Sequence, residues 1–170
     1  MNHIVIIGFM GSGKTRVGKR LAKDLNLPFI DVDRIITKKF NMSVKEVFER
    51  FGEPFYRALE TLAIKNLIED KERKVLSLGA GLPIQNQKYL KELGTVIYLK
   101  GSYAVLKKRL EGSSNPLIEG GDQEDKIKKL LKQRDPVYAR FADIQVETGV
   151  QPFEGLIEEI EEKLAAYTKK

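Results

Sequence analysis

Cysteine and tryptophan are absent from the 170-residue sequence, and His3 is its only histidine. Without cysteine the chain has no disulfide, no thiolate zinc site and no cysteine nucleophile, and it suits a reducing compartment. We expect His3, which precedes the first apolar run, to be an exposed terminal residue rather than a catalyst. Function must therefore come from other side chains and from the backbone.

Long apolar runs are also lacking. None approaches the roughly 20 residues that cross a membrane, and the N-terminal run is too short for the apolar core of a signal peptide. We therefore expect a cytoplasmic protein with no membrane partner. The net charge is +6, but basic and acidic residues are interleaved, and the densest basic run, residues 126–134, is typical of a solvated helix face. A nucleic-acid partner is therefore not expected, and a phosphate-rich small substrate explains the charge equally well.

Short apolar runs alternate with helical patterns, which is typical of an α/β fold with a parallel sheet. Strands are expected near residues 4–8, 29–33, 75–78, 95–99 and 144–146. Helices are expected near residues 14–25, 43–51, 53–70, 85–93, 102–110, 122–138 and 152–167. The second should open with a capping box from Ser43 to Glu46 and turn Phe51 inward. Residues 111–121 are rich in glycine and polar side chains and fit a mobile lid. We predict one domain over residues 1–170, with three α-β-α layers around a five-stranded parallel sheet.

The stretch from Gly8 to Thr15 reads G-x-x-x-x-G-K-T directly after the first apolar run. Its glycines allow positive φ and bring N–H groups towards an anion, and the helix that follows favours phosphate at its N-terminus. In such a P-loop the lysine reaches the β- and γ-phosphates and the Thr15 hydroxyl ligates Mg²⁺. We therefore predict a phosphotransferase that uses ATP and Mg²⁺. The candidate ATP-binding residues are Gly11, Ser12, Gly13, Lys14, Thr15, Arg16 and Arg109.

Asp31 and Asp33 stand at the end of the second expected strand. Residues two apart on a strand point to the same side, and in a doubly wound sheet the carboxyl ends of the strands face the ligand crevice. Two carboxylates there could hold Mg²⁺ or its waters and accept the proton of a substrate hydroxyl. The alternative is that Asp33 only caps the next helix.

Three further segments carry candidate binding residues. Arg57 and Glu60 are three apart on a helix, so a carboxylate could hold a guanidinium for a substrate carboxylate, although such pairs are common on helix surfaces. Gly79-Ala80-Gly81 follows a buried strand and could let a ligand approach the backbone, or form a plain turn. Arg134 could supply a second cation to an anionic substrate or simply lie on a helix surface.

Taken together and in order over essentially the whole chain, these motifs resemble the shikimate kinase family, small P-loop kinases of the nucleoside-monophosphate-kinase-like fold. The matching segments are the phosphate loop at residues 11–15, D-x-D at 31–33, G-E-x-x-[FY]-R-x-x-E at 52–60, the small-residue turn at 79–81 and R-x-P-x-Y at 134–138. The resemblance implies MgATP-dependent phosphorylation of the 3-hydroxyl of shikimate, in the biosynthesis of aromatic amino acids, by a monomer.

The resemblance also implies roles for single residues. Shikimate is bound by Asp33, Arg57, Gly79, Ala80, Gly81 and Arg134. The two arginines hold its carboxylate, and Glu60 orients Arg57. Asp33 and Lys14 are the catalytic residues: Asp33 holds the hydroxyl and takes its proton, and Lys14 neutralises the transferring phosphoryl group. Thr15 ligates Mg²⁺, with Asp31 acting through water.

The sequence departs from the family pattern at the lid and at the turn. Asn115-Pro116-Leu117 stands where the family carries Arg-Pro-Leu, residues 111–121 contain no lysine or arginine, and Ala80 replaces a glycine. Either Arg109 or Lys126 substitutes for the lid arginine, or turnover is slow, or the acceptor differs. The alternatives left open are a related kinase of another hydroxy acid or a nucleoside monophosphate, and a regulatory module that binds nucleotide.

Overall fold

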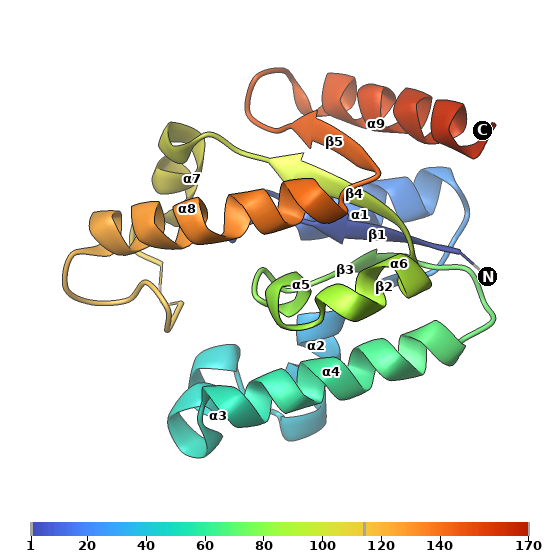
Figure 1. Ribbon diagram of the computed structural model, residues 1–170. Coiled ribbons are helices and arrows are strands. Elements are labelled where there is room, and N and C mark those ends of the chain that lie inside the picture. The colour runs from blue at the N-terminus through green and yellow to red at the C-terminus, as the bar shows by residue number, and fades with distance from the viewer. Residues whose placement is uncertain (1, 114, 170) are drawn as a thin grey trace.

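The sheet of the computed structural model, which describes residues 2–113 and 115–169, has five parallel strands. They are β1 (His3–Ile7), β2 (Phe29–Asp31), β3 (Val75–Ser77), β4 (Gly94–Lys100) and β5 (Ile144–Glu147). Their order is β2-β3-β1-β4-β5, and every neighbouring pair is parallel. Figure 1 shows this sheet at the centre of the molecule with helices around it. The predicted five-stranded parallel α/β fold is confirmed.

Alternation along the strands divides the core into two layers. Ile4 and Ile6 of β1 pack against the helices α1 (Lys14–Asp24) and α9 (Phe153–Thr168). Val5 and Ile7 face the opposite layer, formed by α4 (Glu53–Glu69), α7 (Tyr103–Leu110), α8 (Gln123–Phe141) and shorter helices. Because both faces of the sheet are covered, the central strands β1 and β4 are buried almost throughout. The edge strand β5 instead alternates buried Ile144 and Val146 with exposed Gln145 and Glu147.

Two helices lie beside the sheet rather than on it. α2 (Val32–Phe40) and α3 (Val44–Phe51) group with α4 at one end of the molecule (Figure 1) and share a small apolar cluster around Val47. The predicted capping box of α3 is present, with the Ser43 hydroxyl accepting from the Glu46 N–H and the Glu46 carboxylate accepting from the Ser43 N–H. Phe51 was expected to face inward, but its side chain is 42% exposed and stacks on Phe55.

The segment predicted as one helix over residues 85–93 is broken. It forms α5 (Leu82–Gln85), the 3₁₀ turn η1 (Gln87–Tyr89) and α6 (Leu90–Leu93). Asn86 has φ −124° and ψ 31°, so it leaves the helical region. Its side chain accepts a hydrogen bond from Thr61 and donates one to the Leu82 carbonyl. These contacts, one of them to α4, hold the break in place.

The expectation that His3 is exposed is wrong, because the residue is 1% exposed. Its Nε2 bonds to the Leu67 carbonyl at 2.8 Å and its Nδ1 accepts from the Lys74 N–H at 3.2 Å. Since Nδ1 accepts, Nε2 carries the proton. The ring therefore joins β1 to the end of α4 and has a structural role.

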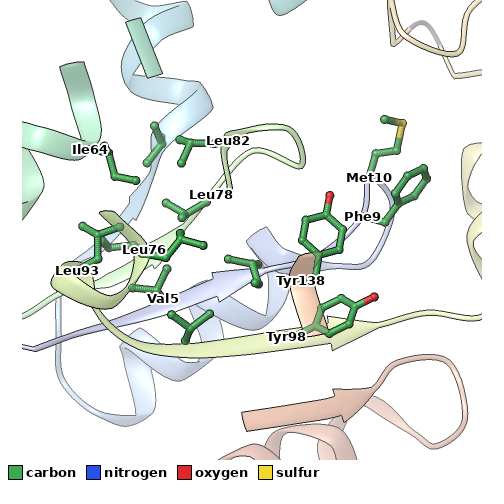
Figure 2. Packing of buried hydrophobic residues seen from close by; sticks show 14 of the residues in the cluster. Val5, Phe9, Met10, Ile64, Leu76, Leu78, Leu82, Leu93, Tyr98 and Tyr138 are labelled. Atoms are coloured by element: carbon green, nitrogen blue, oxygen red, sulfur yellow. The ribbon is translucent and has the colours of Figure 1, made fainter. Parts of the chain in front are cut away.

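The loop after β1 is anchored in the core. Phe9 and Met10 belong to the same apolar cluster as Tyr98 and Tyr138, and Figure 2 shows all four side chains. The rings of Tyr98 and Tyr138 lie with their centroids 5.3 Å apart.

Among the helices in the described parts of the chain, none is long and apolar enough to cross a membrane.

Candidate functional site

The phosphate loop, residues 8–13, joins β1 to α1 and depends on its glycines. Gly11 and Gly13 have φ of 78° and 93°, in the left-handed region that favours glycine. A Cβ on Gly8 would lie 2.7 Å from Ser12 Oγ and 2.8 Å from the Leu99 carbonyl oxygen. The loop therefore packs against β4 as closely as its backbone allows.

Lys14 begins α1 and lies half-buried near two carboxylates. Its Nζ donates to the Phe9 carbonyl at 3.0 Å, across the loop. Burial lowers the pKa of Lys14 to about 8, although the negative charges of Asp33 and Asp31 oppose that shift. Next to it, the Thr15 hydroxyl donates to Asp31 Oδ2 at 3.0 Å. A cation, a hydroxyl and two carboxylates thus gather at the start of α1.

Asp33 lies in the first turn of α2, not on the strand, because β2 ends at Asp31. The Asp31 carboxylate caps α2 by accepting the Asp33 N–H at 3.1 Å. The expectation that Asp31 and Asp33 point to the same side of one strand is therefore wrong, and so is the alternative that Asp33 is the cap. Both carboxylates still lie close enough for their charges to act on Lys14, because the helix starts at once after the strand.

The Asp33 carboxylate is held from two sides. The Tyr56 hydroxyl donates to its Oδ1 at 2.5 Å. A Cβ on Gly79 would lie 2.5 Å from the same oxygen, so the carboxylate rests directly on this glycine. Burial raises the pKa of Asp33, whereas the bond from Tyr56 lowers it. Tyr56 was not among the predicted site residues, because the sequence pattern does not indicate where its hydroxyl points.

Arg57 and Glu60 on α4 form the predicted ion pair, with Nη1 2.6 Å from Glu60 Oε1. Glu53 adds a second contact, 3.2 Å from its Oε1 to Arg57 Nη2. The Glu60 side chain is fully buried, and burial raises its pKa to about 7 against the opposing charge of Arg57. Two carboxylates therefore hold one guanidinium in a fixed orientation.

The turn from Gly79 to Gly81 lies against this guanidinium. A Cβ on Gly81 would be 2.5 Å from both terminal nitrogens of Arg57. The Ala80 carbonyl accepts a hydrogen bond from the Tyr138 hydroxyl at 2.5 Å, which ties the turn to α8. In the described residues, positive φ outside glycine occurs only at Asn26 and Asn41, so Ala80 fits its position without backbone strain.

Arg134 enters the same cavity from α8. It is 8% exposed, and among the described residues its buried Nη1 has no hydrogen-bond partner. Its charge lowers the pKa of both Lys14 and Glu60. The cavity is lined by Met10, Asp33, Val44, Phe48, Tyr56, Arg57, Glu60, Gly79, Ala80, Gly81, Asn115, Pro116, Leu117 and Arg134. The structure therefore brings together, in one cavity, the residues that were predicted to bind the substrate and that lie far apart in the sequence.

The two remaining candidates for ATP binding differ in position. Arg109, in the last turn of α7, donates from Nη1 to the carbonyls of Gly11 and Ser12 at 3.1 and 3.3 Å, and also to Thr148. Arg16 is exposed, and its guanidinium lies 3.9 Å from the centre of the Phe153 ring on α9. The structure thus brings Arg109 to the phosphate loop and stacks Arg16 on a neighbouring helix.

Three residues of the predicted lid, Asn115, Pro116 and Leu117, line the cavity. Residue 114 of the lid lies outside the described residues. The Asn115 Oδ1 accepts the Leu117 N–H at 3.0 Å. Glu119 forms an ion pair of 2.8 Å with Lys45 of α3. The Lys126 ammonium donates to the carbonyls of Glu119 and Gly120. Lys126 thus contacts the lid backbone, and neither it nor Arg109 is among the residues that line the cavity.

Known proteins resemble this chain over nearly its whole length. A family model described as shikimate kinase matches residues 10–165. The shikimate kinase of Thermodesulfovibrio yellowstonii is 42% identical over 168 residues, covering 96% of this chain and 93% of that protein. The one from Caldanaerobacter subterraneus subsp. tengcongensis is 37% identical over 172 residues, covering 99% and 98%.

Solved structures give the same picture. The structure of shikimate kinase from Acinetobacter baumannii in complex with shikimate is 32% identical, with a TM-score of 0.88, and covers 100% of this chain and 96% of that one. A gluconokinase from Sinorhizobium meliloti 1021 is 20% identical with a TM-score of 0.67, covering 97% and 92%. The second likeness is one of fold alone.

Proposed function

The chain belongs to the shikimate kinase family and is an ATP-dependent kinase, and we propose that it transfers the γ-phosphoryl group of MgATP to the 3-hydroxyl of shikimate in the cavity between α2, α4 and α8. The observation that carries this assignment is the pairing of Arg57 and Arg134 in one cavity with Asp33. The guanidinium groups of Arg57 and Arg134 suit the carboxylate of the acceptor, and the carboxylate of Asp33 suits its hydroxyl. The relative from Acinetobacter baumannii, solved with shikimate, supports this choice.

The acceptor carboxylate is proposed to bind Arg57 and Arg134. Arg57 is already oriented by Glu60 and Glu53, so little conformational freedom is lost on binding. Arg134 carries a buried nitrogen without a partner in the described residues, which a substrate oxygen would satisfy. A bidentate contact of this kind also fixes the direction of the ring.

The nucleotide phosphates are proposed to bind the loop and Lys14. The positive φ of Gly11 and Gly13 suits a loop whose N–H groups turn towards an anion. Thr15 and Asp31 are the residues that would hold Mg²⁺, because their oxygens already meet at 3.0 Å and Mg²⁺ prefers oxygen ligands. When bound, the ion would neutralise phosphate charge. One or two protein oxygens suffice, since Mg²⁺ keeps water and phosphate as its other ligands.

In the proposed reaction the acceptor hydroxyl oxygen bonds to the γ-phosphorus as the bond to the ADP oxygen breaks. Asp33 accepts the proton that the hydroxyl loses, and Lys14 stays charged beside the transferring group. The chain needs no covalent intermediate. Its contribution is to position the two substrates and to stabilise charge, as expected for phosphoryl transfer.

Coupled release of ADP from MgATP, with and without shikimate, tests this function. We expect turnover to depend on shikimate and expect Arg57→Ala to lower kcat/KM for shikimate about 100-fold or more, since it removes a charged, bidentate contact. Arg50→Ala, on the neighbouring α3 and outside the cavity, is the control and should stay within about twofold. Turnover that ignores shikimate while ATP still binds would overturn the acceptor, and other hydroxy acids and nucleoside monophosphates would then be screened.

A further inference from the structure

Tyr56, like Asn115 of the lid, is a polar residue in the lining of the acceptor cavity to which the proposed function gives no task. It lies in α4 next to Arg57 and is 2% exposed. Its ring packs against Phe48 with centroids 5.1 Å apart. The ring is thus held by apolar packing, and the direction of its hydroxyl is fixed.

That hydroxyl reaches the group that is proposed to accept the proton. It donates to Asp33 Oδ1 at 2.5 Å, and in the described parts of the chain it is the only side chain recorded as donating to this carboxylate. The same oxygen also packs against Gly79, where a Cβ would lie 2.5 Å from Oδ1. Asp33 is therefore held between a hydroxyl and a glycine, with Oδ1 as the anchored oxygen.

We propose that Tyr56 is a positioning residue for Asp33, whose Oδ1 it holds so that Oδ2 is presented to the acceptor hydroxyl. This inference rests on the proposed function, because it needs Asp33 to meet the hydroxyl. Phenylalanine at this position would fill the same space, since the packing of the ring on Phe48 does not involve the hydroxyl. It would, however, leave the carboxylate free to rotate away from Gly79. Catalytic groups have to be held within about 0.5 Å and 10–20° of their working position.

The chain offers a matched control in Tyr98 on β4. This residue is 1% exposed, and its hydroxyl donates to the carboxylate of Asp135 on α8. Neither Tyr98 nor Asp135 lines the acceptor cavity. Replacing either tyrosine by phenylalanine removes one partly buried hydrogen bond to a carboxylate, but only one of these bonds reaches Asp33.

The experiment compares the wild type with Tyr56→Phe and Tyr98→Phe by coupled ADP release, with shikimate and ATP varied in turn. We expect Tyr56→Phe to lower kcat about tenfold, the lower end for losing a hydrogen bond to a charged group. KM for shikimate and for ATP should change less than about threefold, because the residues proposed to bind the acceptor carboxylate and the nucleotide are untouched. Tyr98→Phe should keep kcat within about twofold.

A second background tests whether the hydroxyl acts through Asp33. In Asp33→Ala there is no carboxylate to position, so adding Tyr56→Phe should change the residual kcat less than about twofold. A Tyr56→Phe enzyme with wild-type kcat would overturn the proposal, as would equal losses in both phenylalanine variants or a tenfold loss that persists without Asp33. Absence of shikimate-dependent turnover in the wild type would instead be a failure of the proposed function.

Discussion

The phosphate loop and the acceptor cavity are built in different ways. Residues 8–13 form one continuous segment, and their geometry comes from glycine φ angles and from the backbone of one turn. The cavity takes side chains from α2, α4, α8, the lid and the turn after β3. The loop is therefore a local structure, whereas the cavity exists only after distant segments have packed.

The two regions also differ in charge, and they are coupled. Lys14 is the cation of the loop and faces Asp31 and Asp33, whereas the cavity pairs Arg57 with buried Glu60. Arg134 acts on both regions, because its charge lowers the pKa of Lys14 and that of Glu60. We therefore expect changes in the cavity to act mainly on the acceptor, with a smaller electrostatic effect on the nucleotide.

Besides Arg57→Ala, the largest expected effect comes from Gly79→Ala. A Cβ there would lie 2.5 Å from Asp33 Oδ1, so the carboxylate has to move. Displacing a reacting group by about 1 Å can lower the reaction rate about 100-fold. We expect a loss of that order in kcat/KM for shikimate. ATP affinity, measured by calorimetry, should stay within about twofold.

Ala80→Gly is the control in the same turn. Ala80 has no positive φ, so glycine removes only a methyl group and adds freedom to the unfolded chain. We expect normal kinetics and a loss of about 0.5–1 kcal/mol in the free energy of unfolding. If Ala80→Gly impaired turnover as much as Gly79→Ala, contact between Gly79 and Asp33 would not be the cause.

A smaller effect, in the opposite direction, is expected for Asn115→Arg. Asn115 lines the cavity in a lid whose residues 111–121 contain no cation. Arginine there could approach the transferring phosphoryl group, and we expect kcat to rise about tenfold, well below the full effect of an arginine finger. Asn115→Ala loses the same bond to the Leu117 N–H without adding charge, so a rise in both variants would rule out the charge as its cause.

The smallest expected effect is a pH dependence of ATP binding. Burial lowers the pKa of Lys14 to about 8, and bound phosphate would raise it. Well below pH 8 the lysine is charged with or without ATP, so binding takes up almost no proton there. Above pH 8 the free chain has to gain a proton on binding, so affinity at pH 8.5 should be weaker than at pH 7.0 by about fourfold.

Calorimetry in two buffers of different ionisation enthalpy measures this proton uptake. We expect uptake at pH 8.5 and almost none from Lys14 at pH 7.0. In Lys14→Arg the uptake should disappear, because a guanidinium stays charged throughout this range. Equal uptake in the wild type and in Lys14→Arg would assign the titration to another group.

The parts of the fold that were predicted correctly depend on local patterns. The β1 strand, the glycine loop and the capping box at Ser43 each occupy a few neighbouring residues. The errors arose where a distant residue decides the outcome. Asn86 breaks a helical pattern because it bonds to Thr61, and His3 is buried because it joins two segments. Asp33 lies on a helix because the Asp31 carboxylate caps that helix directly after the strand.

The sequence alone predicted three features: the P-loop chemistry, the parallel α/β architecture and the pairing of Arg57 with Glu60. These depend on backbone angles, on periodicity and on spacing within one helix, which neighbouring residues specify. The packing of α2, α4 and α8 around one cavity decided that Tyr56 reaches Asp33 and that Arg134 keeps a buried nitrogen without a partner among the described residues. Such contacts join residues far apart in the chain, so their geometry depends on the whole core being formed.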